Sequence, residues 1–129
     1  MDLCCGSGAL GLEFLGSGAS HVTFVDSSPG AIAFVRETLS GFGAATGFEL
    51  RCCDVRRLDW ESLPAADLVF MDPPYGDAVL YSWAGSRDWP AIVSRGGYVF
   101  VEAGPGDSPG DGWERRAYGE SVLFWQEIG

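Results

Sequence analysis

Short apolar runs alternate with longer amphipathic stretches along the first hundred or so residues of the chain. The apolar runs have the length of buried strands, and the longer stretches carry apolar residues at helical spacing. This alternation predicts βαβ units and a mostly parallel sheet. The predicted strands cover residues 1–4, 21–25, 48–53, 67–71 and 98–101, and the predicted helices cover residues 9–15, 29–39 and one or two segments between 77 and 94.

The C-terminal part of the chain departs from this alternation. After a loop rich in Gly, Pro and Asp, residues 113–118 and 121–128 flank Gly119 and Glu120, with no helix-like stretch between them. Two apolar segments joined by a short turn that contains glycine predict a β-hairpin. We expect this hairpin to close one edge of the sheet.

Composition places the chain among ordinary globular proteins. It has 129 residues, of which 47% are hydrophobic and 20% charged, and its net charge is −10. That charge argues against a protein that grips nucleic acid with its whole surface. No apolar run approaches the ~18 residues that span a membrane, and the N-terminus lacks the basic residues of a signal peptide. We therefore expect one domain over residues 1–129, monomeric and cytoplasmic, with no membrane partner.

The cysteines form two adjacent pairs, Cys4-Cys5 and Cys52-Cys53, and His21 is the only histidine. Adjacent cysteines cannot easily chelate one tetrahedral zinc ion, and no Cys-x-x-Cys pair is present. We predict reduced, mostly buried thiols with a packing role and no metal site.

A glycine-rich loop joins the first predicted strand to the first helix. Gly6 would permit the tight turn, Gly8 would let a ligand approach the backbone closely, and Gly11 would let the helix pack on the strand. Asp26 ends the second strand, where a carboxylate can accept two hydrogen bonds from ribose hydroxyls. This arrangement suits a nicotinamide dinucleotide or S-adenosylmethionine. Asp2 favours the latter, because a carboxylate there can face an ammonium group but would repel a pyrophosphate.

The third strand ends next to Asp54 and Val55, at the carboxyl edge of the sheet. The carboxylate of Asp54 could accept a hydrogen bond from an adenine amino group, and the amide of Val55 could meet the ring. The same aspartate could instead cap a short helix that begins at Val55.

The segment Asp72, Pro73, Pro74 and Tyr75 directly follows the fourth strand. Two prolines fix two φ angles and remove two backbone donors, so the loop is stiff and presents acceptors. The carboxylate of Asp72 and the carbonyl of Pro73 can both accept from one planar NH₂ group, while the ring of Tyr75 offers a stacking surface for a flat base. Positioning an exocyclic amine in this way is the main requirement for its methylation.

Residues 2–13 and 67–75 resemble the class I S-adenosylmethionine-dependent amino-methyltransferases. Within that class they are most similar to the bacterial 16S ribosomal RNA guanine-N2 methyltransferases of the RsmD type, with residues 6–13 as the most specific run. The resemblance continues through residues 97–102 and 119–126 and so covers nearly the whole chain.

The resemblance implies a Rossmann-like α/β fold: a mostly parallel seven-stranded sheet with a C-terminal antiparallel hairpin and helices on both faces. It implies methyl transfer to the N2 amine of a guanine that is flipped out or unpaired, in ribosomal RNA or the assembling small ribosomal subunit. The predicted catalytic residues are Asp72, Pro73, Pro74 and Tyr75. The predicted residues for S-adenosyl-L-methionine are Asp2, Cys4, Gly6, Ser7, Gly8, Asp26, Ser27, Asp54, Val55 and Asp72.

Two features depart from the family pattern. Members usually carry a basic N-terminal segment of some tens of residues that contacts RNA, and we expect such a segment to be missing upstream of Met1. The net charge of −10 also differs from an RNA-binding surface. The basic doublets Arg56-Arg57 and Arg115-Arg116 are expected to be solvated surface pairs. We expect the five tryptophans to pack in the core or at edges, with Trp83 the best placed for a binding role.

Three other interpretations remain open. The same loop could orient a DNA base amine or a protein glutamine amide. The chain could be a non-catalytic remnant that binds S-adenosylmethionine, which the intact segment 72–75 opposes. A nicotinamide-dependent oxidoreductase would account for the glycine loop but would leave segment 72–75 unexplained.

Overall fold

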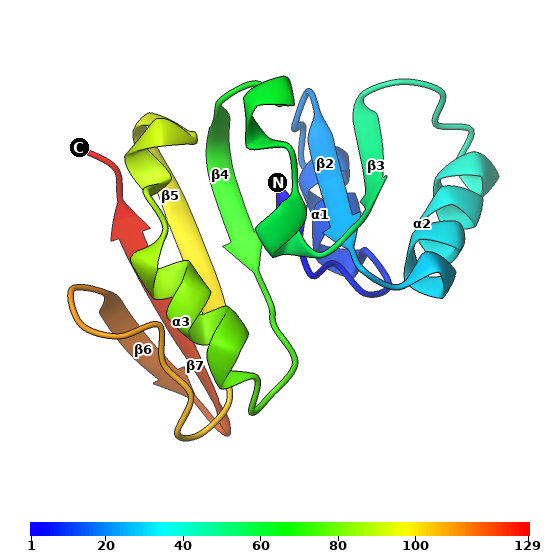
Figure 1. Cartoon of the computed structure of the whole chain (residues 1–129). Coiled ribbons are helices and arrows are strands. Elements are labelled where there is room, and N and C mark those ends of the chain that lie inside the picture. Colours follow the sequence, from blue (N-terminus) through cyan, green and yellow to red (C-terminus); the bar gives the residue numbers. More distant parts are fainter. The chain divides into compact units, whose positions relative to one another are not determined.

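The computed structural model describes residues 1–129, which form two compact units, Met1–Leu58 and Asp59–Gly129. The chain has seven strands in a mixed sheet, three in the N-terminal unit and four in the C-terminal unit (Figure 1). The expected seven-stranded Rossmann-like fold with a C-terminal antiparallel hairpin is confirmed. That the whole chain acts as one domain stays a prediction. None of the helices has the length and apolar character that crossing a bilayer requires.

The N-terminal unit is a parallel βαβαβ arrangement. Its strands lie in the order β3-β2-β1, with Asp2 opposite Phe24 and Val22 opposite Phe48. The second helix begins as its sequence predicts, because Ser28 Oγ accepts a hydrogen bond from Ala31 N at 3.2 Å. The elements are β1 (Asp2–Leu3), α1 (Ala9–Gly16), β2 (Val22–Asp26), α2 (Pro29–Gly41), β3 (Phe48–Cys52) and the 3₁₀ turn η1 (Val55–Arg57).

Both helices of this unit pack on the side of β2 that carries Phe24. Val35 of α2 is fully buried in the same cluster as Phe24, and Leu12 of α1 lies against it. Gly11 shows how close α1 comes, since a Cβ at that position would lie 2.3 Å from Phe24 Cε1. The role predicted for Gly11, to let helix and strand approach, is therefore the one that the packing requires.

The C-terminal unit combines one parallel pair of strands with an antiparallel hairpin. Its strands lie in the order β4-β5-β7-β6, and only β4 and β5 are parallel. Helix α3 crosses in front of these strands in Figure 1. The elements are η2 (Trp60–Ser62), β4 (Ala66–Met71), α3 (Ala78–Ser86), η3 (Trp89–Ala91), β5 (Val93–Ala103), β6 (Glu114–Tyr118) and β7 (Ser121–Glu127).

Alternate residues of β4 and β5 form the core of this unit. Val69 and Met71 are fully buried, as are Val99 and Val101 directly opposite them. Helix α3 is held close to the loop after β5, because a Cβ on Gly85 would lie 1.7 Å from the carbonyl oxygen of Pro109. The helix and that loop are therefore packed backbone to backbone.

Three tryptophans form a cluster in the C-terminal unit. Trp83 of α3 stacks on Trp60 with centroids 6.1 Å apart, and Trp89 meets both rings edge-on. The guanidinium of Arg87 lies 5.0 Å from the Trp60 ring centroid. Trp83, the tryptophan with the best case for binding, thus has a packing role in this structure.

The contact at Gly11 predicts a position-specific loss of stability. Gly11→Ala should lower the free energy of unfolding by about 1–3 kcal/mol, since the added methyl forces Phe24 out of place in a full core. Gly16→Ala is the matched control, because it lies in the same helix with nothing within 4 Å of its Cβ position. Urea unfolding of both variants measures the difference. Equal midpoints would contradict the tight packing of α1 on β2.

Candidate functional site

The carboxylate of Asp26 links two loops of the N-terminal unit. Its Oδ2 accepts a hydrogen bond from Gly6 N at 2.9 Å, and its Oδ1 accepts one from Ser28 N at 2.9 Å. Each carboxylate oxygen has room for a second donor. Asp26 can therefore shape the glycine loop and still accept hydrogen bonds from ligand hydroxyls.

Asp2 is a buried carboxylate beneath the start of α1. The residue is only 3% exposed, and its Oδ2 accepts a hydrogen bond from Gly11 N at 3.0 Å. A negative charge near the N-terminus of a helix is electrostatically favourable. The structure thus fixes the position of this carboxylate, and its interaction with an ammonium group stays a prediction.

The structure requires glycine at positions 6 and 8 for different reasons. Gly6 has a φ of +54°, and nothing lies within 4 Å of a Cβ built on it. Gly8 has a φ of +76°, but a Cβ there would lie 2.7 Å from Val35 Cγ2. Packing inside the unit therefore accounts for Gly8, whereas Gly6 is the glycine with open space above it. Cys4, between β1 and these glycines, also has a left-handed backbone, with a φ of +57°.

The thiol of Cys5 is unsuited to nucleophilic chemistry. Burial, together with the negative charges of Asp2 and Asp26, raises the pKa of Cys5 to about 12. A protonated thiol is a poor nucleophile. This agrees with a packing role for Cys5. The prediction of mostly buried thiols is wrong, because Cys4, Cys5 and Cys53 are only partly buried and Cys52 is exposed at the end of β3.

Asp54 caps the turn η1, which was one of the two roles that its position in the sequence predicted. Its Oδ1 accepts a hydrogen bond from Arg56 N at 2.9 Å, and its Oδ2 pairs with the Arg56 guanidinium at 2.5 Å. Hydrogen bonding from Arg56 lowers the pKa of Asp54 to about 2. Val55 is buried, and its N–H has no partner inside the turn because it occupies the first position. A role of Asp54 and Val55 at an adenine ring stays a prediction.

The two serines of the predicted set lie at the surface of the N-terminal unit. Ser7 is exposed in the glycine loop, and Ser27 is exposed directly after Asp26. The carbonyl of Ser27 accepts a weak hydrogen bond from Cys52 Sγ at 3.8 Å, which joins the ends of β2 and β3. Both hydroxyls are therefore accessible.

In the C-terminal unit, Asp72 begins the loop after β4. Burial is the main cause that raises the pKa of Asp72 to about 6, and the negative charge of Glu102 adds to it. The residue nevertheless remains exposed to solvent. A carboxyl group that titrates near neutral pH at the carboxyl end of a parallel strand is suited to accepting a proton from a ligand.

Tyr81, which no local sequence pattern indicates, contacts the carbonyl of Pro73. The Tyr81 hydroxyl lies 3.3 Å from Pro73 O and 3.2 Å from Glu102 O, and its single proton can be donated to one of them at a time. Pro73 and Tyr81 are both nearly fully buried. The predicted acceptor at Pro73 O is thus fixed in place by α3, and it retains a second lone pair.

Tyr75 is exposed, yet contacts from three directions hold it. The residue is 63% exposed, and a Cβ on Gly104 would lie 3.1 Å from its ring. The Tyr75 hydroxyl lies 3.3 Å from Ser121 Oγ. The following amide, Gly76 N, donates to Asp107 Oδ2 at 2.9 Å. These contacts present the aromatic ring in a defined position with its outer side open.

Gly104, Asp107 and Ser121 had no local signal of this role. They lie 29, 32 and 46 residues after Tyr75. The sequence around the first two is typical of a turn, and Ser121 follows the hairpin turn. Their link to segment 72–75 exists only through contacts between residues that are far apart in the sequence.

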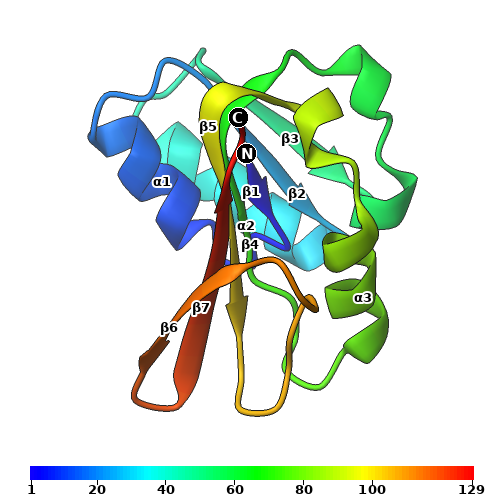
Figure 2. The same cartoon turned by 90° about the vertical axis from the view of Figure 1, so that its left-hand side faces the viewer.

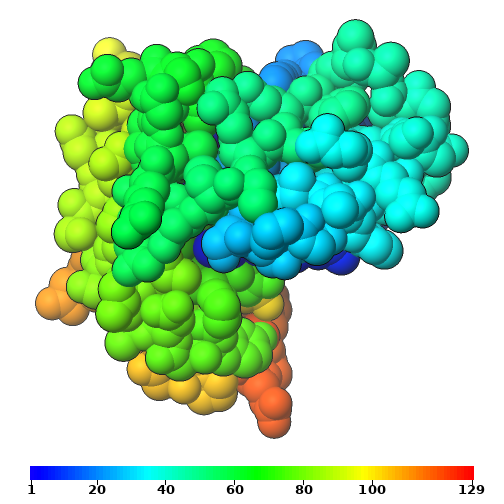
Figure 3. Space-filling model, turned by 45° about the vertical axis from the view of Figure 1, so that its right-hand side comes forward, coloured from blue at the N-terminus to red at the C-terminus, as the bar shows by residue number.

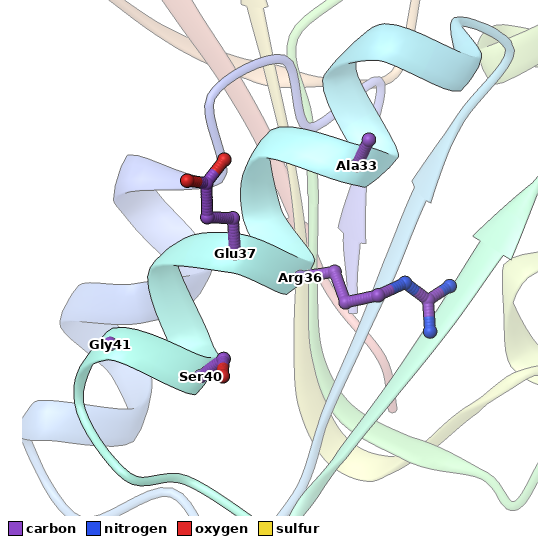
Figure 4. A pocket seen from close by; sticks show the side chains of 5 residues that line it. All are labelled: Ala33, Arg36, Glu37, Ser40 and Gly41. Carbon is purple, nitrogen blue, oxygen red and sulfur yellow. The ribbon is translucent and has the colours of Figure 1, made fainter.

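The outer side of α2 carries a shallow hollow of about 540 Å³. Arg36 and Glu37 point to opposite sides of the helix there, and the outer surface of α2 forms the cyan region of Figure 3 (Figures 3 and 4). The hollow contains none of the predicted site residues. Its lining residues are Ala33, Arg36, Glu37, Ser40 and Gly41.

A family model described as "Conserved hypothetical protein 95" matches residues 1–104. The chain belongs to this family. Members of the Conserved hypothetical protein 95 family thus share the segment that holds both the glycine loop and residues 72–76 of this chain. The hairpin β6–β7 lies outside the matched range.

One curated relative is a Bacillus subtilis (strain 168) protein named "Putative rRNA methyltransferase YlbH". It is 29% identical over 109 residues, which is 79% of this chain and 57% of that protein. This family member therefore spans little more than half the length of its curated relative.

Solved structures share the fold across nearly the whole chain. A hypothetical protein from Thermus thermophilus is 26% identical with a TM-score of 0.79, covering 98% of this chain and 73% of its own. An RNA methyltransferase from Salinibacter ruber, solved with S-adenosyl-L-homocysteine, is 16% identical with a TM-score of 0.73. The match covers 98% of this chain and 78% of the Salinibacter chain. The latter likeness places the fold of this family member among those of methyltransferases.

The raised pKa of Asp72 predicts a pH-dependent stability. The pKa of Asp72 is raised to about 6 in the folded state. Its contribution to the free energy of unfolding is therefore largest below its unfolded-state pKa, and it is lost as the pH rises through about 6. Asp72→Asn, which cannot ionise, should gain stability relative to the parent chain between about pH 4 and pH 8. Urea unfolding at both pH values measures this gain. Asp67→Asn, at an exposed aspartate of β4, is the control. If Asp72→Asn and the parent chain differed in the free energy of unfolding by the same amount at both pH values, the raised pKa of Asp72 would be contradicted.

Proposed function

We propose that this chain transfers a methyl group from S-adenosyl-L-methionine to the exocyclic N2 amine of a guanine in 16S ribosomal RNA. The observation that carries the proposal is the stiff loop of residues 72–75. It combines a carboxylate, a fixed carbonyl and an exposed, held aromatic ring. These are the groups that a planar base amine requires.

The N-terminal unit fits the cofactor. The open space above Gly6 accommodates a ligand close to the backbone, and Asp26 has acceptor capacity for ribose hydroxyls. Asp2 supplies a fixed negative charge for the methionine ammonium. When bound, S-adenosyl-L-methionine supplies a methyl group that its sulfonium already activates. The remaining cofactor residues of the proposal are Cys4, Ser7, Gly8, Ser27, Asp54, Val55 and Asp72.

Segment 72–75 would do three things to the acceptor. Asp72 and Pro73 O would accept hydrogen bonds from the amine, which turns its lone pair away from the ring plane. Tyr75 would stack on the base and hold it in one plane. With a pKa near 6, the Asp72 carboxylate can also take up the proton that the methylated nitrogen releases. Pro73 and Pro74 keep these groups at fixed angles.

Ribosomal RNA is the acceptor that the relatives favour. The Bacillus subtilis relative is named for rRNA methylation, and the Salinibacter ruber neighbour is an RNA methyltransferase. The partner would be ribosomal RNA or the assembling small subunit, and we expect the protein to act on it in the cytoplasm as a monomer. The guanine would have to be unpaired or flipped to reach Tyr75. A DNA base amine or a glutamine amide would use the same loop and is the alternative.

Removing the Asp72 carboxylate should separate catalysis from cofactor binding. Asp72→Ala should lower methyl transfer by at least about 100-fold, since the amine loses an acceptor that orients it. Affinity for S-adenosylhomocysteine should stay within about 3-fold of the parent, because the other proposed cofactor residues are all in the N-terminal unit and remain intact. Labelled methyl transfer to unmethylated small ribosomal subunits and calorimetric titration measure the two effects. Normal turnover by Asp72→Ala would refute the catalytic assignment.

Removing the Asp26 carboxylate should act mainly on cofactor binding. Asp26→Ala should weaken S-adenosylhomocysteine binding by about 10-fold or more, because the ribose loses its acceptor and Gly6 its anchor. Glu37→Ala, at an exposed carboxylate of α2, is the matched control in the same unit. Calorimetry with NADH as a second ligand tests the choice of cofactor. Binding of NADH alone would refute the proposal.

A further inference from the structure

The turn of the hairpin β6–β7 lies beside Tyr75. The Tyr75 hydroxyl is 3.3 Å from Ser121 Oγ, and Ser121 is the first residue of β7. Ser121 pairs directly with Tyr118, the last residue of β6. Side chains of directly paired residues lie on the same face of a sheet. Tyr118 and the hydroxyl of Tyr75 therefore meet Ser121 on one side of the hairpin.

Tyr118 and Arg116 form an exposed pair on that side. Tyr118 is 51% exposed, and the Arg116 guanidinium lies 5.4 Å from its ring centroid. Two residues apart on one strand, they share a face. Every residue of β6 is exposed, since this strand is the outer edge of its unit (Figure 2).

The C-terminal unit is strongly acidic, so an exposed arginine beside an aromatic ring is unusual in it. Residues 59–129 contain twelve acidic side chains and only four arginines, and two of those arginines are Arg115 and Arg116 on β6. Arg115 is directed to the other face, where it lies 5.8 Å from the Phe124 ring centroid. Of the two arginines of β6, Arg116 is therefore the one on the side of the hairpin that carries Ser121.

We propose that Tyr118 and Arg116 bind the nucleotide next to the target base in single-stranded RNA. The inference rests on the proposed function, which puts the target base on Tyr75. A base can stack on the exposed Tyr118 ring, and Arg116, held over that ring, can reach the adjoining phosphate. Glu114 in β6 and Glu120 in the hairpin turn are close to the pair in the sequence, and their negative charges repel phosphate and oppose a longer RNA contact here.

Binding of a short RNA tests the pair without requiring catalysis. The probe is a fluorescein-labelled, unstructured dodecamer RNA that contains guanine, measured by anisotropy with the whole chain. Tyr118→Ala should weaken binding by about 5- to 100-fold, the loss expected for one stacked base, while Tyr118→Phe should retain it. Arg116→Ala should weaken binding and reduce the slope of log affinity against log salt by about one. Arg95→Ala, which removes an exposed arginine of β5, is the control and should leave both the affinity and this slope close to those of the parent chain.

The outcomes separate this inference from the proposed function. If Tyr118→Ala and Arg116→Ala bind the RNA like the parent while Tyr75→Ala does not, the inference fails and the proposed function stands. An equal loss in Arg95→Ala and Arg116→Ala overturns the inference in favour of nonspecific charge. No binding of the RNA by the parent chain overturns it as well. Titration with S-adenosylhomocysteine then shows independently whether the cofactor half of the proposed function holds.

Discussion

The parallel pairing of β1 with β2 is the constraint on which the N-terminal site depends. Asp2 lies opposite Phe24 and Leu3 opposite Val25, so both strands end at the same edge. The backbone continues this pairing beyond β1, since Cys5 N donates to Val25 O at 2.9 Å. Only in this register can Asp26 reach Gly6 and fix the glycine loop. A shift by one residue would turn every side chain of β1 to the other face and break that contact.

The C-terminal site meets two requirements that usually conflict. A stacking ring must stay open to its ligand, but an exposed side chain is normally free to change rotamer. Here the immobilising contacts lie at the edge of the Tyr75 ring and in the backbone after it, at Ser121, Gly104 and Asp107. The buried residues are Pro73 within the loop and Tyr81 of α3, whose hydroxyl contacts the Pro73 carbonyl. The loop is therefore organised before a ligand arrives, which reduces the entropy lost on binding.

Local signals in the sequence predicted most of the fold. Ser28 followed by proline marked the start of α2, and the glycine loop and segment 72–75 fell at strand ends as expected. Strand β5 begins at Val93, five residues before the predicted start, because Gly96 and Gly97 interrupt its apolar pattern without ending the strand. The packing of Gly8 against Val35, far along the chain, had no local signal, and the predicted ligand role of Gly8 stays a prediction. Tyr81 and Asp107 were missed for the same reason, since their roles depend on contacts that sequence spacing does not reveal.

The uneven burial of the thiols has a practical consequence. Cys5 keeps its proton well above neutral pH, and burial likewise raises the pKa of Cys53, whereas Cys52 is exposed at the end of β3. Alkylating reagents act on accessible thiolates, so at neutral pH they meet Cys52 before these neighbours. A fluorophore attached there would sit two residues from Asp54 and, through the Cys52–Ser27 contact, near the end of β2. The protein thus carries a native attachment point for an optical reporter of events at its glycine loop.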